Sequence, residues 1–140
     1  MFSSYFREWE VKDEFEKEFI CIFDGWLGED NLHKLDEVTE DEWSKFNTLI
    51  RLISKQYKVQ LANTKLRTLV EIDNIEHHIP TFEESMNKDS EQFSKFVVPE
   101  LECVISEDWD YTYILWYKNK DVVAKLAPII EAAGLYHFHD

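Results

Sequence analysis

Apolar residues recur at helical spacing in the first part of the chain. One stripe, at steps of four, three and four residues, consists of Phe15, Phe19, Ile22 and Trp26. It reaches Gly25 and Gly28, residues that commonly end helices. A second stripe follows residues 39–42, where Thr39 and Glu42 fit a capping box; it consists of Trp43, Phe46, Ile50, Ile53 and Tyr57. Both stripes predict amphipathic helices.

Further helices are predicted before Pro99. One of them continues the helical spacing toward Pro80 and is interrupted near residues 63–64. Its apolar positions are Leu61, Leu66, Leu69 and Val70. Thr81 and Glu84 fit a second capping box. The stripe that starts there contains Phe82, Met86, Phe93 and Phe96. Residues 1–98 are therefore predicted to be mainly helical, with about four helices.

The pattern changes after Pro99. Leu101, Cys103 and Ile105 alternate with polar residues, which predicts a strand. A turn over residues 106–111 and a second strand over 112–118 follow, then a helix over 122–133 and a closing strand over 135–139. A strand–helix–strand connection makes a right-handed crossover between parallel strands. The sequence thus predicts one α+β domain, residues 1–140, in which the α-rich N-terminal part packs on a C-terminal three-stranded mixed sheet (99–140) of ββαβ order.

Charge is strongly segregated in this chain of 140 residues with net charge −14. Residues 1–43 hold 14 acids and 4 bases, and residues 71–110 hold 12 acids and 2 bases. Residues 44–70 between them hold 6 bases and no acid. A net negative charge disfavours nucleic acid and anionic membranes, which are negative themselves, and favours a basic partner. The sequence therefore predicts a basic protein partner, no nucleic acid and no membrane.

Several kinds of function lack their sequence signals. The chain has three Gly and no GxxxxGK[ST], GxGxxG, HExxH, CxxC or GxSxG pattern. We therefore predict no cofactor and no catalytic residue, and we favour a protein that is not an enzyme. No apolar export signal and no stretch long enough to span a membrane occurs, so the predicted compartment is the cytoplasm. Cys21 and Cys103 lie in apolar surroundings and are predicted to be reduced and buried.

Two alternatives rest on other residues. Imidazoles gather in two clusters, His77/His78 and His137/His139, which raises the hypothesis of a small metal-binding protein or hydrolase. A metal site needs three or four convergent ligands, and the sequence offers at most two on one side, so we predict no metal site.

A basic stripe supplies the other alternative. Arg51, Lys55 and Lys58 follow at steps of four and three and would form one side of a helix. Such a stripe is typical of an anion-binding surface, which would make the chain a regulatory domain for an anionic ligand. The competing interpretation is that acids of the flanking blocks pair with these bases inside the fold, and we favour it because of the net charge.

The densest mixture of acids and aromatics lies at residues 105–117, ISEDWDYTYILWY. Exposed aromatics with nearby charges are typical of protein-binding surfaces, where rings supply contact area and charges steer the encounter. We predict a partner-binding site at Glu107, Asp108, Trp109, Asp110, Tyr111 and Tyr113. The competing interpretation is that Trp109 packs back on the core and that the acids only cap a hairpin. The sequence therefore favours a non-enzymatic interaction module for a basic partner, such as an inhibitor or an immunity-type protein.

Overall fold

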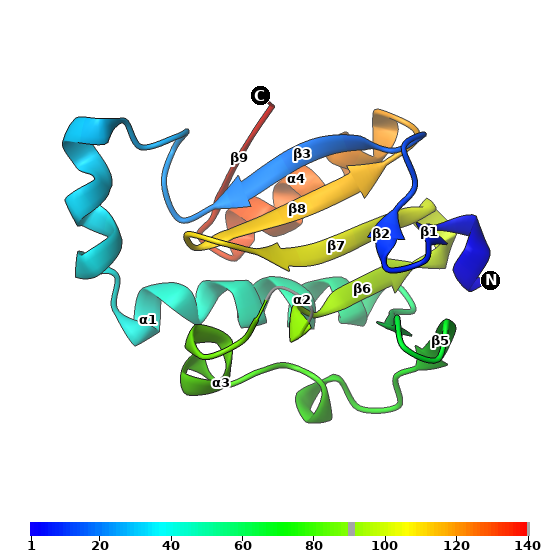
Figure 1. Cartoon of the computed structure of the whole chain (residues 1–140). Coiled ribbons are helices and arrows are strands. Elements are labelled where there is room, and N and C mark those ends of the chain that lie inside the picture. The colour runs from blue at the N-terminus through cyan, green and yellow to red at the C-terminus, as the bar shows by residue number, and fades with distance from the viewer. Residues whose placement is uncertain (90–91, 140) are drawn as a thin grey trace.

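The computed structural model describes residues 1–89 and 92–139, which form mostly sheet (Figure 1). The main sheet is antiparallel and has the order β5-β4-β6-β7-β8-β3-β9. Its strands are β3 (Glu16–Cys21), β4 (Gln60–Asn63), β5 (Thr68–Glu71), β6 (Lys95–Val98), β7 (Cys103–Asp108), β8 (Thr112–Tyr117) and β9 (Tyr136–Phe138). A separate short hairpin consists of β1 (Phe6–Arg7) and β2 (Glu10–Val11).

Four α-helices are found among the described residues: α1 (Glu40–Trp43), α2 (Lys45–Gln56), α3 (Phe82–Met86) and α4 (Asp121–Ala132). Short 3₁₀ segments are η1 (Phe2–Ser4), η2 (Glu29–Glu37), η3 (Ile75–His77) and η5 (Pro99–Leu101). The two long helices, α2 and α4, pack against each other and cover one face of the main sheet (Figure 1). The core between them and the sheet includes the fully buried Phe46, Ile50, Leu115, Leu126 and Ile130.

The opposite face of the sheet is covered only in part. The β1–β2 hairpin lies over β6 and β7, where Phe2, Phe6 and Phe15 pack with Val97 and Val104 in a second apolar cluster (Figure 1). Because β6 and β7 are covered in this region by helices on one side and by the hairpin on the other, both strands carry buried residues on consecutive positions.

The predicted fold class is wrong. Residues 1–98 are not mainly helical, because they contribute strands β1 to β6, and the sheet has seven strands rather than three. The expected parallel neighbours, β8 and β9, do run in the same direction, since each is antiparallel to β3. However, β3 lies between them, so the predicted strand order is also wrong.

Where the sequence predicted a helix over residues 15–26, residues 16–21 form the strand β3 and residues 22–26 form no helix. The residues of β3 alternate between the two faces: Glu18 and Ile20 point toward the helices, whereas Lys17 and Phe19 lie on the other side. The run FICIF is apolar on consecutive positions, which suits a strand covered on both faces as well as a helix. The segment forms a strand because its backbone hydrogen-bonds to β8 on one side and to β9 on the other.

Two other predicted helices are also wrong in whole or in part. Residues 61–70 form the β4–β5 hairpin, whose turn holds Arg67 in the left-handed region at φ 55°. The helix after Thr81 ends at Met86, and Phe96 belongs to β6. Residues 90–91, which fall inside that predicted helix, lie outside the described residues.

Several local predictions are confirmed. Thr39 accepts a hydrogen bond from the Glu42 amide, as the first capping box requires, and Thr81 accepts one from the Glu84 amide. The stripe that follows Thr39 forms α1 and α2, and the expected hairpin is β7–β8. Cys21 and Cys103 are free and buried.

Candidate functional site

The β7–β8 turn has an unusual backbone. Asp108 pairs with Thr112, and the three residues between them connect the strands. Asp110 and Tyr111 are consecutive and both have a positive φ, 58° and 56°. Such a conformation is tolerated by Asp but is strained for a bulky ring, at a cost on the order of 1–3 kcal/mol. The surrounding fold therefore holds this turn in a shape that its own residues disfavour.

Trp109, at the tip of the turn, is 57% exposed. Its indole packs edge-on against Phe93, with ring centroids 4.8 Å apart. Two cavities meet at this side chain, one on each side of the turn. Trp109 is therefore supported on one side while it presents a large apolar surface to solvent.

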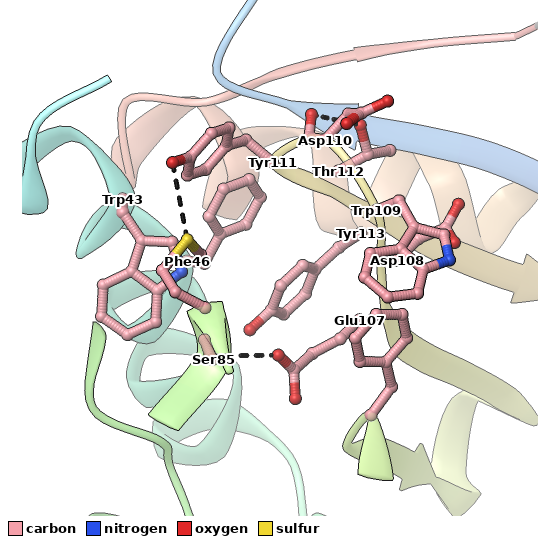
Figure 2. Close-up of a pocket in the computed structure, with 12 residues that line it drawn as sticks. Trp43, Phe46, Ser85, Glu107, Asp108, Trp109, Asp110, Tyr111, Thr112 and Tyr113 are labelled. Carbon is pink, nitrogen blue, oxygen red and sulfur yellow. Dashed lines mark hydrogen bonds between the residues drawn. The ribbon is translucent and has the colours of Figure 1, made fainter. Parts of the chain in front are cut away.

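The first cavity, here called the turn pocket, has a volume of about 200 Å³ (Figure 2). Aromatic side chains make much of its wall: Trp43, Phe46, Phe93, Trp109, Tyr111 and Tyr113. Polar groups enter it from Ser85, Glu107, Asp108, Asp110 and Thr112. Helices α1, α2 and α3 and the hairpin β7–β8 thus contribute to one concave surface.

Glu107 is buried and belongs to the fold's internal network. Its Oε1 accepts hydrogen bonds from Lys88 Nζ at 2.6 Å and from the Ser94 amide at 2.8 Å. Its Oε2 accepts one from Ser85 Oγ at 3.2 Å (Figure 2). A carboxylate with three donors, one of them cationic, holds α3 and the start of β6 against β7.

Tyr113 is buried at the floor of the turn pocket. Its ring stacks on Phe46, with centroids 4.5 Å apart and an interplanar angle of 17°. Burial, and to a smaller extent the charge of Glu107, raises the pKa of its hydroxyl well above the ordinary value. The hydroxyl oxygen is buried and has no hydrogen-bond partner. Figure 2 shows it directed toward Ser85 and the Glu107 carboxylate.

The other predicted site residues lie at the rim. Asp110 is exposed, while Asp108 and Tyr111 are half-buried. Burial raises the pKa of the Asp108 carboxyl. Tyr111 donates a hydrogen bond to Met86 Sδ at 3.5 Å, and its pKa is raised by burial and then by Asp36 of η2. The negative charge at the rim therefore comes from the turn and from η2 together.

The second cavity, of about 170 Å³, lies between the turn and the segment after β3. Trp26, Leu32 and Leu35 line it together with Trp109. Among the exposed large apolar side chains of the described residues, Trp26, Leu32, Met86 and Trp109 all line one of these two cavities. Such grouping of exposed apolar surface is typical of an interaction site.

The six predicted site residues thus surround one pocket, but in different roles. Trp109 and Asp110 face solvent, Asp108 and Tyr111 border the pocket, and Glu107 and Tyr113 are buried. Their participation in partner binding stays a prediction.

Sequence reasoning missed the residues that complete the pocket around the turn, among them Trp43, Ser85 and Phe93, and the partners of Glu107, Lys88 and Ser94. One signal was present. Cys103, Ile105 and Glu107 alternate on one side of a strand, so extending the predicted strand by two residues would have placed Glu107 toward the buried face.

The histidine clusters do not assemble a metal site. His137 Nδ1 lies 2.7 Å from Glu18 Oε2, and His139 Nδ1 lies 3.0 Å from the Lys17 carbonyl oxygen. His77 is exposed and His78 half-buried at η3. Throughout residues 1–89 and 92–139, no group of three or more His, Cys, Asp or Glu side chains is arranged to hold a metal ion.

The basic stripe is divided by the end of α2 at Gln56, so Lys58 does not share a helix with Arg51 and Lys55. Arg51 donates two hydrogen bonds to Glu76, at 2.7 and 2.9 Å. Lys58 Nζ lies 3.0 Å from Glu71. Glu76 and Glu71 both belong to the acidic segment 71–110. This agrees with the interpretation that acids flanking the basic segment pair with its bases inside the fold.

No protein family, curated protein or solved structure matches this chain. Across the part of the chain that the structure describes, no helix combines the length and the apolar character that crossing a membrane requires.

Proposed function

We propose that this chain is a non-enzymatic interaction module that binds a basic protein partner at the β7–β8 turn. The observation that carries the proposal is the exposed Trp109, which lines two cavities with largely aromatic and apolar walls and lies beside acidic side chains. A large, rigid ring next to a pocket is the usual anchor of a protein interface. An inhibitor or immunity-type protein for a basic toxin or nuclease is the form of module that we favour.

The charges around the turn support a basic partner. Asp110 is exposed at the tip, and Glu29, Asp30, Asp36 and Glu37 are exposed on or at the ends of η2. Rim acids of this kind accelerate the encounter with a basic surface, and their effect falls as salt rises. As part of the same proposal we assign the chain to the cytoplasm, where its two free, buried cysteines stay reduced.

The test compares Trp109→Ala with Trp9→Ala in quantitative capture of proteins from native lysate. Trp9 is a matched control because it is 59% exposed and lines neither cavity of the turn. We expect wild type and Trp9→Ala to retain the same basic protein at about 0.1 M salt and to release it at about 1 M, where charges are screened within ~3 Å. Trp109→Ala should not retain it.

Trp9 and Trp109 are both more than half exposed, so truncating either should leave the protein folded, while Trp109→Ala also loses the ring contact with Phe93, worth about 0.5–1.5 kcal/mol in urea unfolding. If Trp109→Ala retains the partner as well as Trp9→Ala does, the turn is not the binding site. If the captured protein is acidic, or if salt does not affect its release, the electrostatic part of the proposal is wrong.

A further inference from the structure

The size of the turn pocket limits what it accepts. Its volume of about 200 Å³ is below the ~300–1,000 Å³ typical of pockets for drug-sized ligands. The pocket opens beside Trp109, at the point where the proposed function brings the partner's surface. One side chain of the partner is an occupant of suitable size.

The polar atoms inside the pocket call for a hydrogen-bond donor. The Tyr113 hydroxyl is buried and without a partner, which costs a protein free energy unless a ligand supplies the missing bond. Glu107 Oε2 accepts only from Ser85, whereas Oε1 already accepts from Lys88 and Ser94. The Tyr113 hydroxyl oxygen and Glu107 Oε2 can therefore each accept a further hydrogen bond. Figure 2 shows the hydroxyl directed toward the Glu107 carboxylate.

The walls and the rim favour a cation. Trp43, Phe46 and Tyr111 present aromatic surface to the cavity, and the faces of such rings attract cations. Asp108 and Asp110 stand at its edge. Burial is the larger cause of the raised pKa values of Tyr113 and Tyr111, and the negative charges of Glu107 and Asp36 add to it in the same direction.

From these observations we infer that the turn pocket receives a single arginine side chain of the basic partner. Its planar guanidinium stacks on aromatic rings and has five N–H donors, enough for Tyr113 Oη and Glu107 Oε2 together. A lysine ammonium is more strongly hydrated and does not stack in this way, so it fits the pocket less well. Met86, which lines the pocket, is an unbranched and flexible side chain that can adjust to the guanidinium. This inference rests on the proposed function, because it assigns the chemistry of the partner at the same site.

The test uses two capped tripeptides, Gly-Arg-Gly and Gly-Lys-Gly, titrated into the ¹⁵N-labelled protein and followed by NMR shifts of the Trp43 and Trp109 indoles. The decisive variant is Tyr113→Phe, which keeps the ring stacked on Phe46 and removes only the unpartnered hydroxyl. Tyr117→Phe is the matched control, since Tyr117 is equally buried on the same strand and lies outside the pocket.

We expect wild type and Tyr117→Phe to bind the arginine peptide with the same affinity, and more tightly than the lysine peptide. Tyr113→Phe should bind it roughly tenfold more weakly, the loss of one hydrogen bond to a charged group. Its melting temperature should equal or exceed that of wild type, because no folded-state hydrogen bond is removed. Weak binding in a fully stable variant separates a role in recognition from a role in folding.

The inference is overturned if wild type does not bind the arginine peptide, if Tyr113→Phe binds it as tightly as Tyr117→Phe, or if lysine binds equally well. None of these results touches the capture experiment with Trp109→Ala and Trp9→Ala. The proposed interaction surface can therefore survive when the arginine pocket fails. Conversely, failure of Trp109→Ala to lose the partner would reject the surface whatever the peptides do.

Discussion

Replacing Glu107 by Gln removes one negative charge from a buried network and leaves the shape of the side chain nearly unchanged. The amide nitrogen of Gln cannot accept the hydrogen bonds that Lys88 and the Ser94 amide donate to Oε1, or the one that Ser85 donates to Oε2. Whichever way the amide is oriented, Lys88 loses its charged partner. The substitution therefore tests how strongly α3 and β6 depend on this carboxylate.

The structure indicates the size of the effect. Lys88 Nζ lies 2.6 Å from Glu107 Oε1, and the two side chains are 15% and 6% exposed. Removing one partner of a buried ion pair typically costs about 3–5 kcal/mol. Lys88 keeps some contact with solvent and a 3.3 Å contact with Ser94 Oγ, which favours the lower limit. We expect a loss of about 3 kcal/mol, or roughly 6–12 °C in Tm for a chain of this length.

Urea unfolding followed by circular dichroism measures this loss as a lower midpoint at an unchanged slope. Glu71→Gln is the matched control, because the Lys58–Glu71 pair has a similar distance, 3.0 Å, but side chains that are 66% and 61% exposed. Exposed pairs contribute about 0–1 kcal/mol. The double variant Glu107→Gln/Lys88→Met should recover much of the stability, because no unpaired charge remains buried.

Two results would refute this reasoning. One is a loss in Glu107→Gln no larger than that in Glu71→Gln. The other is a double variant whose loss equals the sum of the two single losses, since that would mean that the carboxylate and Lys88 are not coupled.

Three other predictions concern the fold. Leu115→Ala empties a fully buried position between the sheet and the helices and should cost about 2–5 kcal/mol in urea unfolding; a loss under 1 kcal/mol would contradict the assigned core. Thr39→Ala removes the cap of α1 and should cost about 1 kcal/mol, whereas an unchanged melting temperature would mean that the capping box does not stabilise the protein. Burial raises the pKa of the Cys103 thiol from 9.0 to about 12, so the folded thiol should not react with a disulfide reagent at pH 9. Because the unfolded thiol ionises first, the free energy of unfolding should fall as the pH rises from 9 to 12, and this fall should be smaller in Cys103→Ala; equal falls would reject the assignment.

The turn of the candidate site was predictable, while its pocket was not. Glu107, Asp108, Trp109 and Asp110 lie together in the chain, and the acids, Ser and the change of periodicity indicate a hairpin turn there. The pocket needs Trp43, Ser85 and Met86 as well, and these come from helices far away in sequence. Nothing in a single sequence indicates that such residues meet, because their meeting depends on how the helices pack on the sheet.

By itself, the sequence determined those features that depend on neighbours in the chain. Hydroxyls three residues before Glu specify the caps of α1 and α3, and the helical spacing around Phe46 specifies α2. The alternation after Pro99 specifies the β7–β8 hairpin, and the net charge of −14 is independent of any fold.

Only the tertiary structure decided that residues 16–21 form a strand between β8 and β9, that residues 60–71 form a hairpin, and that Glu107 is buried. The physical reason is that short apolar runs suit a helix and a strand almost equally, so the partner that supplies hydrogen bonds and cover makes the choice. For β3 that partner, β8, lies about ninety residues further along the chain, as in the pair Cys21 and Thr112, out of reach of any local pattern.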